Sequence, residues 1–159
     1  KIKISFYLLN GFSFRGLAMN DSGSLSDIHD IRSGDGIKLM VDLFYSNARQ
    51  DPLLGPIFER MINDWEEHLP TMYQFWERLL FGFSDYSGNP FQKHLNFSLE
   101  KEHFSGWVKI FTQTIDGNFS GLKAEEAKRL ARNIANSFQL RMGITSENND
   151  FEPIRYMRN

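Results

Sequence analysis

The sequence contains no cysteine. This absence excludes disulfide bonds, a thiol nucleophile, iron–sulfur ligation and a thiolate ligand to any other metal centre. It also excludes covalent attachment of a prosthetic group through a Cys-x-x-Cys-His motif. Any large cofactor must therefore be held by packing and by the side chains of other residue types.

The chain also lacks a strong excess of charge of either sign. It carries 18 Lys and Arg against 20 Asp and Glu, a net charge of −2, and its isoelectric point is about 6.1. Nucleic acids and anionic membranes select strongly basic surfaces, so the composition gives no reason to expect either partner.

Long apolar runs are scarce, and the nearest approach lies within residues 1–20. Asn10, Gly11 and Arg15 interrupt that run, which is too short and too broken to span a bilayer. A poorly packed extension, an export signal and a structured element are all compatible with it, and Met19 is a candidate start. We expect an N-terminal extension over 1–23, a single domain over 24–143 and a polar tail over 144–159.

Aromatic residues are abundant, with 15 Phe and 3 Trp in 159 residues. Apolar side chains recur at helical spacing in several segments, and no strand pattern is found, so the fold is predicted to be all-α. Residues 20–36 have a linker composition, with one short helical turn allowed at 24–31. The predicted helices are Ile37–Ala48, a helix from Asn63 or Asp64 with Pro70 as the alternative start, a short helix after Pro90, Leu99–Phe119 and Lys123–Met142.

Two further expectations concern individual segments. Leu53–Phe58 should form a compact turn or a short helix after Asp51-Pro52 ends the first helix. The last predicted helix carries Lys and Arg residues mixed with Glu, a pattern typical of a solvated face. The basic residues of that face are Lys123, Lys128, Arg129 and Arg132.

The candidate functional residues are histidines. There are four, His29, His68, His94 and His103. His94 lies on the short helix after a Gly- and Ser-rich loop, where its backbone can adjust to a metal, while His68 begins the aromatic-rich second helix. Such an arrangement suits the two sides of a haem pocket, although a lone histidine is more often a surface or packing residue. His29 and His103 receive no role.

An ordered set of residues makes the haem hypothesis more specific. The set consists of Phe44-Tyr45, Pro56-Ile57-Phe58, Trp65-x-x-His68-Leu69, Met72, Phe75-Trp76, Tyr86-x-Gly88-x-Pro90, Lys93-His94-Leu95, His103-Phe104-x-x-Trp107 and Phe111. From about Ile31 to Met142 the chain resembles the group III truncated haemoglobins. The resemblance implies a truncated globin-like two-over-two helical sandwich around haem b (iron protoporphyrin IX).

The resemblance also implies residue roles. His94 would be the proximal iron ligand, and Tyr45, His68, Met72 and Trp107 would form the distal side, with His68 gating access. The pocket walls would be Phe44, Phe58, Phe75, Trp76, Lys93, Leu95, Phe97 and Phe111. Without the resemblance, Tyr45 and Trp107 would be ordinary core residues. Lys93 and Tyr86 are guesses for partners of the haem propionates.

Two classes of function follow from such a pocket. One is binding of O2, CO or NO at ferrous haem, and the other is redox chemistry, either nitric oxide detoxification or a peroxidase-like reaction. The redox reading needs an external reductase, because the chain has no flavin or nicotinamide motif. A haem-free helical interaction domain is the third class. We expect a cytoplasmic monomer or weak dimer.

Overall fold

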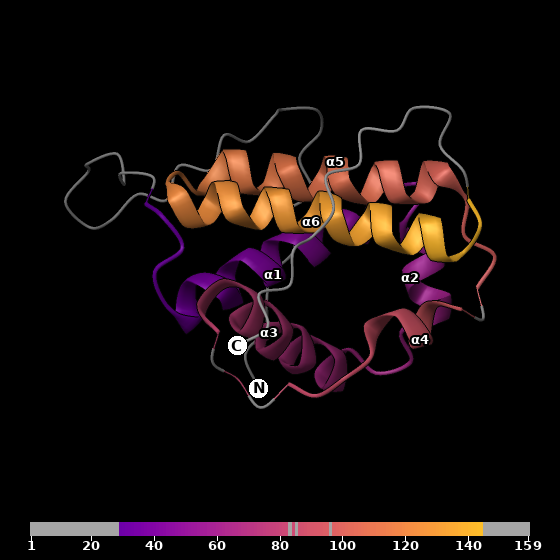
Figure 1. The fold of residues 1–159 in the computed structure, drawn as a ribbon, viewed down its shortest axis with the longest axis horizontal. Coiled ribbons are helices and arrows are strands. Elements are labelled where there is room, and N and C mark those ends of the chain that lie inside the picture. Colours follow the sequence, from indigo (N-terminus) through magenta and orange to yellow (C-terminus); the bar gives the residue numbers. More distant parts are fainter. Residues whose placement is uncertain (1–28, 83, 85, 96, 145–159) are drawn as a thin grey trace.

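A computed structural model describes residues 29–82, 84, 86–95 and 97–144. This part of the chain is helical and contains no strand, which confirms the all-α prediction. The α5 and α6 helices lie side by side as one layer, and α1 and α3 form the other, as Figure 1 shows. The elements are α1 (Gly34–Ala48), α2 (Gly55–Met61), α3 (Trp65–Phe81), α4 (Pro90–His94), α5 (Lys101–Asn118) and α6 (Leu122–Arg141).

Local sequence signals explain where the first two helices begin and end. Ser33 accepts a hydrogen bond from the backbone N–H of Gly36, so α1 starts at Gly34, earlier than the apolar pattern indicated. The helix ends at Ala48. Asp51 then accepts the N–H groups of the next residues, Leu53 and Leu54, at 2.9 Å each. This turn leads directly into α2, which extends one helical turn beyond the expected segment.

The third helix is continuous from Trp65, so the alternative start at Pro70 was wrong. Asp64 caps it by accepting from the backbone N–H groups of Glu66 and Glu67 at 2.8 and 3.1 Å. Pro70 is exposed, and because it has no N–H the helix loses only the backbone hydrogen bond to the carbonyl of Glu66. Glu66 is exposed in the first turn of the helix. A continuous helix fixes the directions of all the side chains that the pocket hypothesis needs.

Aromatic stacking holds the two layers together. Phe111 of α5 stacks on Trp76 of α3, with ring centroids 4.8 Å apart, and on Trp107 of α5 at 5.5 Å. Phe44 of α1 meets Phe111 edge-on at 5.5 Å. Burial of rings of this size contributes several kcal/mol, on the order of 1.5–3 for each fully buried side chain. The core therefore lies where α1, α3 and α5 meet.

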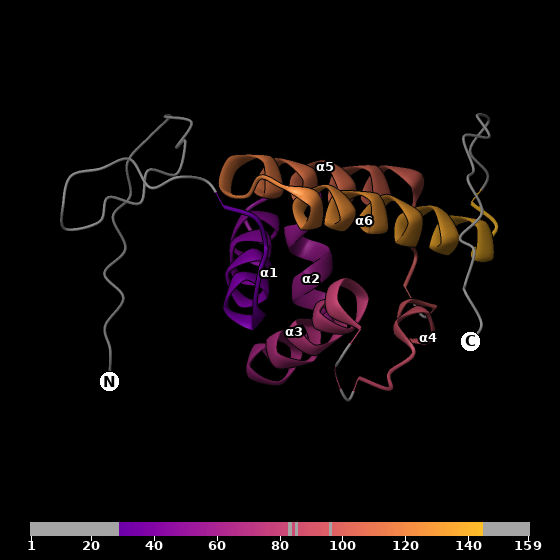
Figure 2. The same ribbon diagram turned by 60° about the vertical axis from the view of Figure 1, so that its left-hand side comes forward.

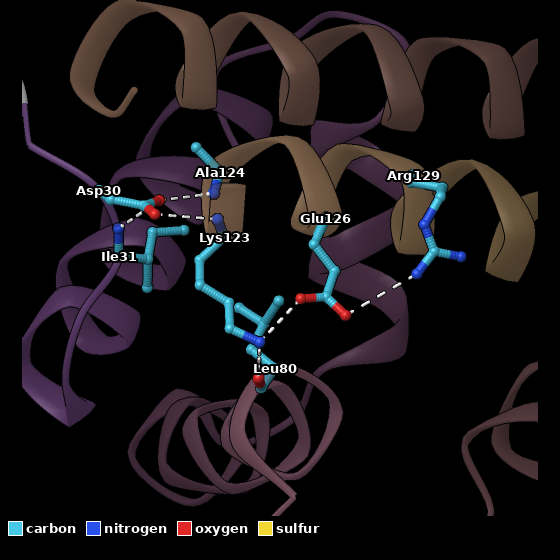
Figure 3. A network of polar contacts seen from close by, with 7 residues as sticks. All are labelled: Asp30, Ile31, Leu80, Lys123, Ala124, Glu126 and Arg129. Atoms are coloured by element: carbon cyan, nitrogen blue, oxygen red, sulfur yellow. Dashed lines mark hydrogen bonds and ion pairs between the residues drawn. The ribbon is translucent and has the colours of Figure 1, made fainter. Parts of the chain in front are cut away.

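A network of polar contacts fixes the start of α6, as seen in Figure 3. Asp30 accepts the N–H groups of Lys123 and Ala124 at 3.0 and 2.8 Å, and that of Ile31 at 2.9 Å. Ile31 itself is fully buried. The predicted linker therefore ends before Asp30, since these two residues belong to the core and to the cap of α6. Gly121 has a φ of +139°, and a Cβ there would strike the Asp30 carboxylate.

Two of the basic residues of α6 have partners on other helices. The ammonium of Lys123 donates to the Leu80 carbonyl at the end of α3 and to Glu126 at 2.8 Å. The side chain of Lys128 is only 12% exposed and pairs with Asp116 at 2.6 Å and with Glu125 at 2.7 Å. The solvated-face prediction was wrong for Lys128, because Asp116 of α5 lies over it, whereas the side chain of Lys123 is 36% exposed.

Helix ends elsewhere follow the sequence closely. Gly82 adopts a φ of +79° at the end of α3 and Gly143 a φ of +72° after α6, as expected for helix-ending glycines. The predicted extension over 1–23 lies outside the described residues, and so does the tail except for Ile144. No helix in the described part of the chain is both long enough and apolar enough to span a membrane.

Candidate haem site

The distal residues suggested by the sequence are brought together by α1 and α3. The Tyr45 hydroxyl lies 2.8 Å from Nε2 of His68, which is hydrogen-bond distance for either tautomer of the ring. Burial raises the pKa of the Tyr45 hydroxyl, so it stays protonated. Burial also lowers the pKa of His68, and electrostatic interactions with Lys93 and His94 on α4 act in the same direction. A neutral imidazole therefore meets a phenol.

A second layer covers this pair on the solvent side, and sequence reasoning did not identify it. The Trp65 ring meets the rings of Tyr45 and His68 edge-on, with centroids 5.4 and 5.8 Å apart. The Arg49 guanidinium lies 4.3 Å from the centre of the Trp65 ring and pairs with Glu59. Trp65 itself was the sequence feature that could have revealed this layer. It stands three residues before His68 and is therefore its neighbour on the helix surface.

The other two distal candidates lie in the same region. Trp107 meets Phe44 edge-on at 5.6 Å, and Phe44 in turn contacts Tyr45 at 4.9 Å. Within the described part of the chain the indole N–H of Trp107 makes no hydrogen bond, so it is a free donor. Met72 is half-buried on α3, one helical turn after His68, and packs against the main core.

The proximal candidate lies on α4, under the C-terminal half of α6 in Figure 2. His94 is half-buried, and its Nδ1 lies 2.6 Å from the Pro90 carbonyl, to which it donates. Burial lowers the pKa of His94, and the hydrogen bond to Pro90 partly opposes that shift. Its Nε2 makes no hydrogen bond to any described residue. Nδ1–H held by a carbonyl leaves a lone pair on Nε2, the form in which a histidine ligates a metal.

The packing around α4 places His94 beside a different apolar cluster from the one that holds the distal residues. Phe91 and Phe138 form a second apolar cluster with Phe104, and the His94 ring meets Phe138 edge-on at 5.1 Å. The distal residues belong instead to the main core, and Ile134 packs against both clusters. His94 offers a neutral imidazole whose Nε2 makes no hydrogen bond to a described residue, a ligand that haem iron would take, and Tyr45 and Trp107 offer donors that would suit a gas bound there. The residues present fit the group.

Three predicted wall residues form the closed aromatic core rather than an open surface. Phe44, Trp76 and Phe111 are each at most 4% exposed and contact one another or Trp107. They support the distal face from behind. That these three residues contact haem stays a prediction.

The remaining wall candidates lie nearer the surface. Phe75 and Phe58 are half-buried, and Phe75 meets Tyr86 edge-on at 5.4 Å. Lys93 and Leu95 are exposed, whereas Phe97 is half-buried. Burial raises the pKa of the Tyr86 hydroxyl.

Helices arranged in two layers, with α5 and α6 against α1 and α3, are the architecture of a truncated globin. Comparison with known proteins gives the branch. The chain is 32% identical over 110 residues to a group 3 truncated hemoglobin from Campylobacter jejuni subsp. jejuni, over 66% of this chain and 87% of that protein. No family model matches it.

A solved structure agrees with this relationship. The fold matches the crystal structure of a group III truncated hemoglobin from Campylobacter jejuni with a TM-score of 0.68 and 29% sequence identity, over 72% of this chain and 94% of that one. The chain belongs to the group III truncated haemoglobins, and the truncated globin fold predicted from the sequence is confirmed. Membership makes it a globin haem protein.

Proposed function

We propose that this protein binds diatomic gases, O2 together with CO and NO, at haem b held by His94. The observation that carries the proposal is the Tyr45–His68 hydrogen bond of 2.8 Å, between the two residues that the family resemblance assigns to the distal side. When bound, haem would supply a ferrous iron able to take a gas ligand. The absence of cysteine favours non-covalent haem b over a covalently attached form.

Each residue has a distinct role in the proposal. Nε2 of His94 binds the iron, and the Pro90 carbonyl holds the ring in the correct tautomer through Nδ1. Tyr45 and Trp107 donate hydrogen bonds toward the ligand position, and such donors favour O2 over CO because O2 acquires more negative charge. Met72 narrows the distal side, and His68 screens it from water.

The aromatic residues named above complete the pocket in this proposal. Phe58, Phe75 and Phe97 present half-buried rings to the cofactor, and Phe44, Trp76 and Phe111 support them from the core. Lys93 and Leu95 lie at its exposed edge, where Lys93 is available to a propionate. A cytoplasmic location and a monomeric or weakly dimeric state are parts of the same proposal.

A spectrum tests the proximal assignment. Reduced wild-type protein and His94→Ala should be compared before and after addition of CO, with His103→Ala as the matched control. His103 accepts the Glu100 N–H at 2.8 Å at the start of α5, and so is a histidine with a purely local role. We expect a five-coordinate ferrous spectrum and a stable CO form in wild type and control. His94→Ala should lose both unless imidazole is added, and an unchanged spectrum would refute the assignment.

Redox chemistry is the second candidate function. Neutral Tyr45 and Trp107 donors suit nitric oxide detoxification or a peroxidase-like reaction as well as simple gas binding, and either reaction needs an external reductase. Rapid oxidation of the O2 form by NO, followed by re-reduction with an added electron donor, would favour the redox function. A slow reaction would favour gas binding alone.

A further inference from the structure

We propose that Arg49 and Trp65 form a latch that holds the His68 side chain closed on Tyr45 and so sets how fast gas ligands enter and leave. We call Glu59, Arg49 and Trp65 the outer latch. The inference rests on the proposed function and extends it to a surface motif that lies outside the predicted pocket.

The contacts of the outer latch form a continuous chain from solvent to the distal pair. Both Nε and one terminal nitrogen of Arg49 donate to the same oxygen of Glu59, at 3.2 and 3.1 Å. The guanidinium then lies 4.3 Å from the centre of the Trp65 ring. Trp65 in turn meets both Tyr45 and His68 edge-on. The Trp65 ring thus connects an exposed ion pair to the distal pair.

Helix geometry explains why Trp65 controls His68. Side chains of an α-helix lean toward its N-terminus, so the His68 ring leans over the turn that carries Trp65. The centroid of the indole lies 5.8 Å from that of the imidazole, so the latch proposal places the indole on the path by which His68 would leave Tyr45 for solvent. A fixed indole therefore keeps the imidazole on the Tyr45 hydroxyl, and a mobile one releases it.

The backbone fixes the arginine in place. Arg49 follows the last residue of α1 and donates its N–H to the Tyr45 carbonyl at 3.0 Å, so its side chain starts next to the distal tyrosine. At the start of α2, a Cβ on Gly55 would lie 2.5 Å from the Arg49 carbonyl. This close approach brings α2, and with it Glu59, within reach of the guanidinium. Three helices therefore converge on the latch.

The strength of these contacts suits a reversible closure. Both partners of the ion pair are about half exposed, at 45% and 58% of their side-chain surface, so solvent and salt weaken it. The stacked guanidinium is an exposed cation–π contact, whose loss changes a rate by about 2- to 5-fold. The latch is thus weak enough to open thermally and strong enough to be measured.

Flash photolysis of the CO complex of the full chain tests the latch. Arg49→Ala and Trp65→Leu should raise the bimolecular CO association rate by about 2- to 5-fold. The dissociation rate should rise by the same factor, leaving the CO affinity unchanged, because a latch acts on the barrier and not on the bound state. Arg60→Ala is the matched control, since Arg60 is exposed on α2 and its Nε donates only to the Pro56 carbonyl.

A second readout does not depend on ligand rates. In the diamagnetic CO form the Arg49 Nε–H proton should show a ring-current shift from Trp65 by NMR, which Trp65→Leu abolishes and Arg60→Ala leaves in place. Rates equal to the control, or an Arg49 proton without that shift, would overturn the latch. A change in CO affinity would also overturn it, because it would mean that the distal pair itself had moved. Wild-type protein that binds no CO would instead refute the proposed function.

Discussion

Replacing Tyr45 with Phe removes the hydroxyl that faces His68 and leaves the ring in its aromatic surroundings. The ring packs edge-on against Phe44, Phe58 and Trp65 at 4.9, 5.5 and 5.4 Å, and these contacts survive the substitution. The effect on O2 release therefore reports the hydroxyl and little else. We expect the O2 dissociation rate to rise.

The size of the increase follows from the charge on the ligand. A hydrogen bond to a charged group contributes about 1.5–3 kcal/mol, which corresponds to about 10- to 150-fold in rate. If Nε2–H of His68 is the donor, the Tyr45 oxygen accepts this hydrogen bond. The Tyr45 O–H then stays available to donate to the ligand. The 2.8 Å contact then strengthens the Tyr45 donor, so the increase should lie in the upper part of this range.

A double-mutant cycle separates the two residues. His68→Leu removes a neutral hydrogen bond worth about 0.5–1.5 kcal/mol, or about 2- to 12-fold in the O2 dissociation rate. Because His68 acts through Tyr45, the double variant should release O2 about as fast as Tyr45→Phe alone. The assay is stopped-flow displacement of O2 by excess CO.

Two results would refute this reasoning. An O2 dissociation rate unchanged in Tyr45→Phe would mean that the hydroxyl does not reach the ligand. Equal effects of His68→Leu in the presence and absence of the Tyr45 hydroxyl would mean that the two residues act independently. Trp107→Phe serves as a comparison, since it removes a donor that has no bond to His68.

Two stability predictions follow from the core and the α6 cap. Phe111→Ala should lower the free energy of unfolding by about 3–5 kcal/mol in urea denaturation, whereas Leu140→Ala, 66% exposed, should change it by less than about 0.5. Asp30→Ala should cost about 0.5–2 kcal/mol at neutral pH. Burial raises the pKa of Asp30, but N–H donors from Lys123 and Ala124 outweigh it and lower the pKa below 3.8. The contribution is therefore present above pH 3.8 and lost as the pH falls through the lowered value, so thermal melts of variant and wild type should converge in acid.

Local features of the sequence were sufficient to predict most helices. Asp64 and Pro90 are start signals that act on the next turn, and Gly82 and Gly143 are stop signals of the same short range. Such signals work because a cap satisfies backbone groups within a few residues. Pro70 was the ambiguous case, since only the exposure of the preceding turn decided that the helix could continue through it.

The partners of individual side chains were not predictable in this way. Asp30 and Lys123 looked like a linker residue and a solvated lysine, yet they meet across more than ninety positions, and Lys123 also reaches the Leu80 carbonyl at the end of α3. The position of Arg49 over Trp65 likewise depends on how α1, α2 and α3 converge. These contacts depend on helix crossing, about which residue spacing carries no information.

The sequence by itself determined the helical class, the positions of the four main apolar faces and the choice of His94, Tyr45 and His68 as candidates. The spacing of apolar residues and the order of motifs can both be seen in the amino-acid sequence alone. Only the tertiary structure decided that the Tyr45 hydroxyl and the His68 ring share a hydrogen bond and that an exposed cation lies over the indole beside them. Those distances arise from the packing of three helices, because side chains on different helices meet only where the helices cross.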